Sequence, residues 1–222
     1  MLDIGLIQLL EPEEITARLA ELQVLVRNDH FVYAAGDHGS AYFAKDLILP
    51  HTEVTASICY HLAQTCREDR IEAVVAPATA GIGLTQWLAW FLNTSPEREV
   101  LALYAEKTAD GFALQRGYDK LINGKRVLVA EDVLTTGSSV VKVIDLVRQH
   151  GGEVTSVVAI CNRGSITAEK LGVPFLRSFL DLDLSRYPVA SCPLCAEGRL
   201  INTSLGHGTT YVAAHGQPSP RS

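Results

Sequence analysis

The residues with the clearest chemical potential lie in the middle of the chain, in the segment VLVAEDVLTTGSSV (127–140). An apolar run leads directly into two carboxylates, Glu131 and Asp132, which can accept hydrogen bonds from the hydroxyls of a ribose. The glycine of the turn that follows permits close backbone approach to a ligand, and its hydroxyl side chains add donors. These features predict a site for a ribose 5-phosphate. The turn consists of Thr135, Thr136, Gly137, Ser138 and Ser139.

The flanking residues indicate which elements position this segment. Val127–Ala130 is a short apolar strand, and Ser138–His150 is a helix with apolar residues at helical spacing. The first amides of a helix have no partner within the helix and can bind anions. Ligands of open α/β sheets bind at the carboxyl ends of the strands, so we expect the acids and the turn to meet there. The alternative is that Glu131 and Asp132 only cap the helix and line a polar loop.

Strands and helices alternate along most of the chain, which predicts an α/β fold with a parallel sheet covered on both faces. Before this region we expect a helix at 11–28 and a strand–turn–strand hairpin at 30–45. The other expected elements are helices at 52–66 and 84–92 and strands at 73–76, 100–104, 154–160 and 174–179.

The composition limits the class of protein. The chain has 222 residues, of which 47% are apolar, and a formal net charge of −6. This charge argues against a nucleic-acid-binding protein, because such proteins usually present a basic face. We expect no membrane association, since no apolar run is long enough to span a bilayer and the acidic N-terminal segment does not resemble a secretory signal. The odd number of cysteines favours a cytoplasmic protein.

The segment 127–140 resembles the signature with which type I phosphoribosyltransferases bind 5-phosphoribosyl 1-diphosphate (PRPP). The resemblance runs from His30 to about Gly208, and within the family it is greatest to orotate phosphoribosyltransferases. The other segments that carry it are HFVYAAGDHGSAYFAKD, APATAGIGLTQW, YAEKTADGFALQRGY, AICNRGS and CPLCAEGRLINTSLGHG.

The resemblance implies a domain layout. A parallel-sheet PRPP-binding core is expected at about 52–180, with a small hood formed by about 1–45 and 180–212. Residues 1–212 would then form a single phosphoribosyltransferase domain. The last ten residues, AAHGQPSPRS (213–222), are expected to be a disordered tail.

The resemblance also assigns roles in PRPP binding. The acids that match Glu131 and Asp132 hold the ribose hydroxyls, and the turn that matches 135–139 holds the 5-phosphate. Many orotate enzymes carry a lysine where Ala80 stands, so here the contact to pyrophosphate must come from the backbone or from elsewhere. The loop that contacts pyrophosphate matches Ala78, Thr79, Ala80 and Gly81.

The segment 106–118 matches a loop that closes over the site in the family. Lys107 is expected to stabilise the departing pyrophosphate, and it joins Glu131 and Asp132 as a catalytic residue. Orotate enzymes usually have several basic residues and a histidine in this loop, whereas here only Lys107 and Arg116 are cationic. The alternative for Lys107 is a solvated loop lysine.

Four residues are expected to bind the base. Arg163 matches an arginine that pairs with the carboxylate of orotate, and a planar guanidinium suits this interaction. Tyr42 and Phe43, in the hairpin of the hood, are expected to cover the ring, and Lys45 is expected to contact orotate. The alternative for Arg163 is a surface arginine that follows a strand.

The implied activity is glycosyl transfer. Ribose 5-phosphate would move from PRPP to orotate, giving orotidine 5′-phosphate and pyrophosphate in pyrimidine nucleotide biosynthesis. Mg²⁺ would bind mainly through PRPP, without direct side-chain ligation. The expected partners are PRPP, orotate and a second copy of the chain in a homodimer. Two alternatives remain open, namely a phosphoribosyltransferase for another base and a non-catalytic PRPP-binding regulator.

Cys192 and Cys195 form a C-x-x-C motif, and His207 follows twelve residues later. Two thiolates and an imidazole are zinc ligands, but no second C-x-x-C completes a set of four. The sequence favours free thiols, with structural zinc and a redox pair as alternatives. The remaining cysteines lie in apolar or helical surroundings and are expected to be buried thiols; they are Cys59, Cys66 and Cys161.

Overall fold

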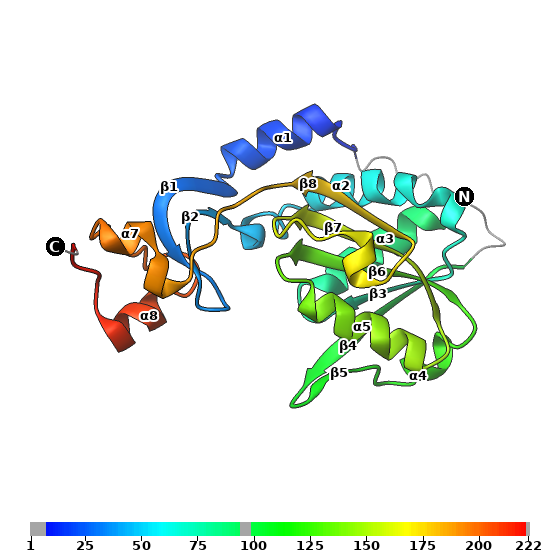
Figure 1. Ribbon diagram of the computed structural model, residues 1–222. Coiled ribbons are helices and arrows are strands. Elements are labelled where there is room, and N and C mark those ends of the chain that lie inside the picture. The colour runs from blue at the N-terminus through cyan, green and yellow to red at the C-terminus, as the bar shows by residue number, and fades with distance from the viewer. Residues whose placement is uncertain (1–7, 94–98, 221–222) are drawn as a thin grey trace. The chain divides into compact units, whose positions relative to one another are not determined.

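The computed structural model describes residues 8–93 and 99–220 (Figure 1). The chain divides into two compact units, a larger one of residues 1–15 and 49–182 and a smaller one of residues 16–48 and 183–222. Each unit therefore combines segments that are distant in the sequence. The first seven residues of the predicted hood lie outside the described residues.

The larger unit is built on a six-stranded sheet with the order β5-β4-β3-β6-β7-β8. Neighbouring strands run parallel, except that β5 forms an antiparallel hairpin with β4. This arrangement confirms the predicted α/β fold with a mostly parallel sheet. The strands are β3 (Ala73–Pro77), β4 (Leu101–Thr108), β5 (Gly111–Ala113), β6 (Arg126–Leu134), β7 (Glu153–Asn162) and β8 (Phe175–Asp181).

Helices cover both faces of this sheet (Figure 1). α2 (Thr52–Thr65) and α3 (Gly81–Leu92) pack against each other on one face, and α5 (Ser138–Gln149) lies on the other. Two short helices, α4 (Tyr118–Leu121) and α6 (Ala168–Leu171), lie in connections. Because the sheet is covered on both sides, β3 is buried along its whole length. The predicted stripe of α5 is buried in the same core as the strands, and its members are Val140, Val143, Ile144 and Val147.

The smaller unit contains one antiparallel hairpin, formed by β1 (Leu25–Val32) and β2 (His38–Phe43), and two short helices, α7 (Pro193–Ala196) and α8 (Gly208–His215). The late segment of the chain is tied to this hairpin. Tyr187 forms an isolated β-bridge with His38, and Asn202 N donates to His30 O at 2.7 Å. A two-stranded sheet buries little apolar area, so a unit of this kind depends on further links.

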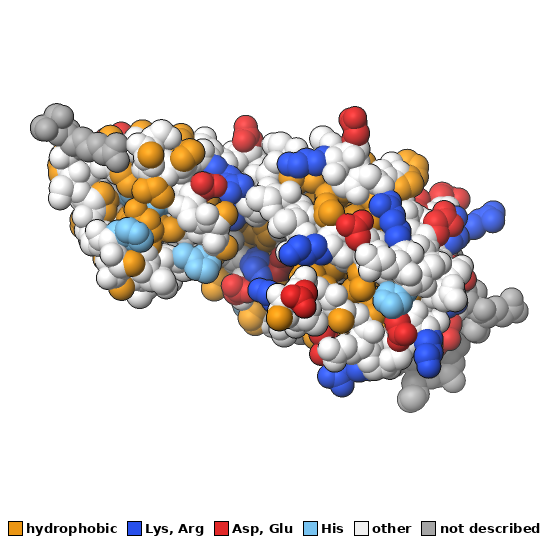
Figure 2. All heavy atoms as spheres, turned by 60° about the horizontal axis from the view of Figure 1, so that its bottom comes forward, with side chains coloured by type: hydrophobic (Ala, Val, Ile, Leu, Met, Phe, Trp, Pro, Cys, Tyr) orange, Lys and Arg blue, Asp and Glu red, His pale blue; other side chains and the backbone are white. Residues whose placement is uncertain are grey.

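The surface of the larger unit carries charges of both signs. On the face drawn in Figure 2, acidic and basic side chains are interspersed over this unit. That face therefore offers no continuous basic surface to a nucleic-acid backbone. Within 8–93 and 99–220, no helix has both the length and the apolar character needed to cross a membrane.

The N-terminal helix is shorter than the pattern predicts. α1 covers Pro12–Glu21, and the last residues of the predicted helix 11–28 belong to β1. Gln23 and Asn28 have positive φ angles of 52° and 60°, which a right-handed helix cannot contain. Val26 continues the helical spacing of Ile15, Leu19 and Leu22 in the sequence, but it lies in a strand that pairs with β2.

The C-terminal residues are more ordered than the prediction of a disordered tail from 213 onward. α8 continues to His215. The Gln217 side chain then accepts from Ile201 N at 2.7 Å and donates to Ile201 O at 3.2 Å. One glutamine thus satisfies both backbone groups of Ile201, a contact that the polar composition of the segment does not reveal. Residues 221–222 lie outside the described residues.

Candidate active site

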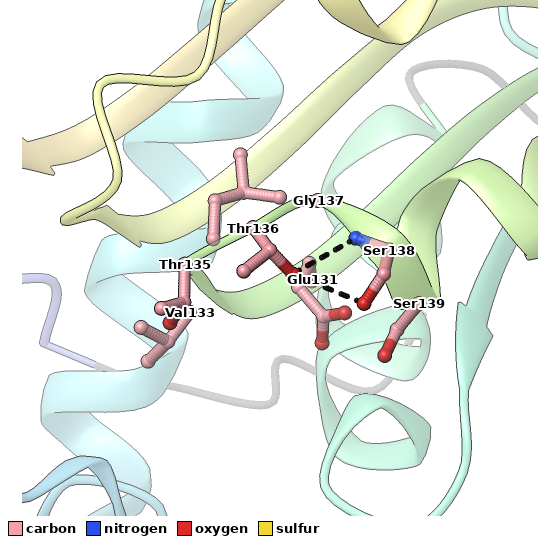
Figure 3. A pocket seen from close by; sticks show the side chains of 8 residues that line it. Glu131, Val133, Thr135, Thr136, Gly137, Ser138 and Ser139 are labelled. Atoms are coloured by element: carbon pink, nitrogen blue, oxygen red, sulfur yellow. Dashed lines mark hydrogen bonds between the residues drawn. The ribbon is translucent and has the colours of Figure 1, made fainter. Parts of the chain in front are cut away.

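The turn that follows β6 forms a pocket of about 140 Å³ (Figure 3). The Thr136 hydroxyl donates to Ser138 Oγ at 3.0 Å, and Ser138 N lies 3.4 Å from the same hydroxyl oxygen. Hydroxyls and the first amides of α5 thus gather at one point, an arrangement that binds anions. The residues that line the pocket are Glu131, Val133, Leu134, Thr135, Thr136, Gly137, Ser138 and Ser139.

The two acids of β6 have different environments. Glu131 is half-buried and lines the pocket, whereas Asp132 is 7% exposed and is not among the lining residues. Both lie within the strand, where successive side chains point to opposite faces. Asp132 Oδ1 accepts a hydrogen bond from Val133 N at 2.6 Å. Glu131 Oε1 accepts in the same way from Asp132 N at 3.1 Å. The two acids therefore differ in their position at the pocket, which Glu131 lines and Asp132 does not, rather than in their contacts to the backbone.

Two glycines allow the turn its shape. Gly137 precedes α5 with a φ of 77°, a conformation that strains residues with a side chain. A Cβ on Gly164 would lie 1.7 Å from Thr135 O, so the chain after β7 passes directly against the turn. Gly137 was predicted as a site residue, but Gly164 was missed because its constraint comes from a distant segment. The only local signal was its position after an apolar strand.

Arg163 lies beside the same turn. Its Nε donates to Thr135 Oγ1 at 3.0 Å, and its backbone N donates to Leu134 O at 2.9 Å. β6 and β7 are parallel neighbours, with Leu134 paired to Asn162, so their carboxyl ends meet. The structure therefore brings the predicted base-binding arginine next to the predicted phosphate turn.

The loop after β3 lies at the same edge of the sheet, because β3 and β6 are parallel neighbours. Ala78 N donates to Ala105 O at 2.9 Å, which ties the loop to β4. A Cβ on Gly81 would lie 2.5 Å from Ala76 Cβ, so α3 starts in close contact with the strand. The loop offers backbone groups and one hydroxyl rather than a cation. It contains the predicted pyrophosphate-binding residues Ala78, Thr79, Ala80 and Gly81.

The predicted closing loop, 106–118, consists of the β4–β5 hairpin and the turn that leads to α4. Lys107 pairs with Phe112 across the hairpin and is exposed. Arg116 Nε donates to Glu106 Oε1 at 2.8 Å, so this positive charge is already paired. Within the described part of the chain Lys107 makes no ion pair, which leaves its charge available to an anionic ligand.

The residues predicted to cover the base belong to the smaller unit. Phe43 is 4% exposed, so it has little surface to offer a ligand. The ring of Tyr42 lies 5.5 Å from that of Phe31, and Lys45 Nζ lies 3.7 Å from the carboxylate of Asp46. The roles of Tyr42, Phe43 and Lys45 in base binding remain predictions.

Comparison with known proteins places this site in a family. Residues 50–176 match the family described as the phosphoribosyl transferase domain. The chain belongs to the phosphoribosyltransferase family. The matched region contains β3, β4, β6 and β7 and the connections between them, so it includes every part of the pocket after β6. The resemblance inferred from segment 127–140 is therefore confirmed.

Several relatives of this phosphoribosyltransferase have curated names. The orotate phosphoribosyltransferase of Carboxydothermus hydrogenoformans is 38% identical over 171 residues, which cover 76% of this chain and 85% of the relative. That of Caldanaerobacter subterraneus subsp. tengcongensis is 35% identical over 189 residues, with coverages of 85% and 94%. The crystal structure of orotate phosphoribosyltransferase from Aeropyrum pernix is similar with a TM-score of 0.60 and 25% identity, covering 76% of this chain and 93% of that one.

Three cysteines of this phosphoribosyltransferase are buried thiols, as predicted. Burial raises the pKa of each of these thiols, to about 12 for Cys161. Because the thiolate is the reactive form, they are expected to be inert at neutral pH. The other two members of this set are Cys59 and Cys66.

Cys192 and Cys195 have histidine neighbours that the sequence did not reveal. They lie in a buried group with His30 and His38. His207, the predicted partner, is not in this group and is exposed, so that prediction is corrected. The C-x-x-C spacing identified the two sulfurs, but His30 precedes Cys192 by 162 positions and no local pattern connects them.

Proposed function

We propose that this phosphoribosyltransferase transfers ribose 5-phosphate from PRPP to orotate, giving orotidine 5′-phosphate and pyrophosphate. The observation that carries the proposal is the pocket after β6, where Glu131 faces a turn of hydroxyls and helix-start amides. The choice of orotate is supported by relatives of that name at 35% and 38% identity.

PRPP binding follows from the chemistry of this pocket. The 5-phosphate accepts hydrogen bonds from the amides and hydroxyls of the turn 135–139. The Glu131 carboxylate accepts hydrogen bonds from the ribose hydroxyls, and Asp132 holds the end of the strand through Val133 N. These contacts fix C1 of the ribose relative to the protein, which lowers the entropic cost of reaction.

The reaction breaks the bond between C1 and a pyrophosphate oxygen while a ring nitrogen of orotate, which has already lost its proton and reacts as an anion, bonds to C1. Positive charge develops on the sugar and negative charge on the departing pyrophosphate. Loop 78–81 offers backbone groups to pyrophosphate, and the exposed Lys107 stabilises its charge when the β4–β5 hairpin closes. Closure also excludes water, which would otherwise hydrolyse PRPP.

Mg²⁺ fits this site as an ion bound mainly through PRPP. The diphosphate and ribose oxygens of PRPP are the hard ligands that this ion accepts, so no side chain has to ligate it directly. When bound, Mg²⁺ neutralises charge on the diphosphate.

Arg163 is the residue that we assign to the orotate carboxylate. Its guanidinium contacts Thr135, one of the residues that line the pocket, through a hydrogen bond of 3.0 Å from Nε to Oγ1. A bidentate pair with a planar carboxylate would favour orotate over neutral bases such as uracil.

By family resemblance we further propose that the enzyme is a cytoplasmic homodimer.

The test is the PRPP-dependent loss of orotate absorbance. Lys107→Ala is expected to lower kcat by about 100- to 1000-fold, as for other groups that stabilise transition-state charge. Arg163→Ala is expected to raise the KM for orotate by about 10- to 100-fold, because a charged hydrogen bond is lost. The control is Lys120→Ala, an exposed cation of α4, which should change neither constant more than about twofold.

Two outcomes would contradict the proposal. Turnover with uracil, adenine or hypoxanthine but not with orotate would assign another base. Tight PRPP binding without pyrophosphate release in the presence of any base would make the protein a regulator.

A further inference from the structure

Four buried side chains of the smaller unit converge on one point, and none of them lines the pocket after β6. They come from three places in the chain. His30 lies in β1, His38 begins β2, and Cys192 and Cys195 lie at the start and within α7. Each residue offers one atom that could bind a metal, a ring nitrogen of histidine or the Sγ of cysteine, and these four atoms all lie within 4.8 Å of one another. We call this group the Cys₂His₂ cluster.

The distances in the cluster resemble those of a tetrahedral zinc site. Zn–S bonds of about 2.3 Å and Zn–N bonds of about 2.0–2.1 Å give S···N edges of about 3.5 Å and an N···N edge of about 3.3 Å. His30 Nε2 lies 3.6 Å from Cys192 Sγ and 3.8 Å from Cys195 Sγ, and Cys195 Sγ lies 3.3 Å from His38 Nδ1. The two imidazole nitrogens are 2.9 Å apart, a few tenths of an ångström closer than the ideal edge.

The hydrogen bonding of His30 prepares its ring for a metal. Nδ1 lies 2.7 Å from the backbone carbonyl oxygen of Arg199. A carbonyl oxygen only accepts, so Nδ1 carries the hydrogen and Nε2 presents a lone pair to the cluster. Zinc-bound histidines commonly have this second hydrogen bond, which fixes the tautomer and the ring orientation.

The size of the smaller unit explains why a metal would be useful there. It has on the order of 70 residues and one two-stranded sheet, too little to form a large apolar core. The cluster joins the β1–β2 hairpin to the segment that follows residue 183, and these two segments are adjacent only after folding. A metal that cross-links them would contribute directly to the stability of the unit.

We propose that the Cys₂His₂ cluster binds one structural zinc ion that fastens the β1–β2 hairpin to α7. Four protein ligands complete a tetrahedral shell, so the site keeps no open position for substrate and is structural rather than catalytic. Two thiolates and two imidazoles favour zinc over Mg²⁺ or Ca²⁺, which prefer oxygen ligands.

The first test measures metal content. The full chain, purified without a histidine tag and without added metal, should contain about one zinc ion per chain when its metal content is measured by elemental mass spectrometry. Cys192→Ser and His38→Ala should each lower the content at least about tenfold, since each removes one ligand. The matched controls Cys59→Ala, a buried cysteine of the larger unit, and His207→Ala, an exposed histidine, should keep the full content.

The second test does not depend on whether the variants fold. Wild-type protein in which zinc is exchanged for Co²⁺ should show the visible absorption of a tetrahedral ion and a thiolate-to-cobalt charge-transfer band in the near ultraviolet. Removal of the metal with a chelator should make Cys192 and Cys195 reactive toward a thiol reagent, while the three cysteines of the larger unit stay protected.

Three outcomes would overturn the proposal. The first is wild-type protein that holds neither zinc nor tetrahedral cobalt. The second is zinc that persists in both ligand variants or that is lost with His207→Ala alone. The third is a Cys192–Cys195 disulfide in the protein as isolated, detected by mass spectrometry without reduction, which would make the pair a redox couple.

Discussion

The turn 135–139 of the larger unit and the Cys₂His₂ cluster of the smaller unit are assembled in opposite ways. Glu131 and the turn 135–139 lie in one continuous segment that runs from the end of β6 into the start of α5. The cluster, in contrast, contains His30 and Cys192, which are 162 residues apart in the sequence. A continuous segment largely sets its own geometry through its backbone. A discontinuous group depends on the rest of the unit, so it is visible only after folding.

The same contrast applies within the active site. The turn 135–139 was recognised from its own residues, whereas the contact between Gly164 and Thr135 joins two strands and was not. The neighbouring acids Glu131 and Asp132 were recognised together, but the pleat of β6 separates their side chains. Local pattern therefore identified the segment, and the sheet decided which of its side chains line the pocket.

Among the changes that test this comparison, the largest effect is expected from Gly164→Ala, which disrupts the contact between the turn and the chain after β7. A Cβ 1.7 Å from Thr135 O cannot fit, so the turn or the chain after β7 must move. We expect a loss of about 3 kcal/mol or more in the free energy of unfolding and about 100-fold in PRPP affinity. Urea unfolding can be followed by the fluorescence of Trp87 and Trp90, which both lie in α3 of the larger unit.

The control for this change is Gly83→Ala. An added Cβ at Gly83 meets nothing within 4 Å, and the position is in α3. Alanine there should stabilise the protein by about 0.5–1 kcal/mol. If Gly164→Ala bound PRPP like the wild type, the turn would be set by its own backbone alone.

An intermediate effect is expected from the two acids of β6. Glu131→Gln should lower kcat/KM for PRPP by about 100-fold, because the pocket loses a charged acceptor of ribose hydroxyls. Asp132→Asn should cost about 10-fold, since its amide oxygen can still accept from Val133 N. Steady-state kinetics with varied PRPP provide the comparison. Equal losses of kcat/KM in the two variants would mean that both carboxylates contact the ribose. The different roles that we infer for Glu131 and Asp132 from their places in β6 would then be wrong.

The smallest effects are expected when one ion pair is removed from each unit and the losses in the free energy of unfolding are compared. In the larger unit Asp69 binds Arg177 through two hydrogen bonds of 2.7 and 3.2 Å, and its side chain is 8% exposed. Asp69→Asn should lower the free energy of unfolding by about 2 kcal/mol, less than for a fully buried pair because Arg177 is partly exposed. In the smaller unit Asp37→Asn breaks a more exposed pair with Arg186 and should cost less than about 1 kcal/mol.

Urea unfolding followed by far-ultraviolet circular dichroism measures both changes. The reverse order of effects would show that the smaller unit relies on its ion pair more than its exposure suggests. That result would weaken the physical reason for a metal link in this unit.

Most of the larger unit could be predicted because its signals are local. The stripe of α5 predicted the buried helix, and apolar runs predicted β3, β6 and β7. The helix predicted at 11–28 is present but ends at Glu21, because residues after Val24 pair with β2 and pairing between strands overrides helical spacing. His207 failed as a ligand because nearness in sequence is a poor guide to nearness in a folded unit.

The sequence by itself determined the fold class, the family and the strand–turn–helix segment that we propose binds phosphate, because these depend on residues that are neighbours in the chain. Only the tertiary structure decided that Glu131 rather than Asp132 faces the pocket, that Gly164 supports the turn, and that His30 and His38 join the two cysteines. Each of these depends on the direction of a side chain or on the meeting of distant segments. Such geometry arises from packing and strand pairing, which no single stretch of sequence contains.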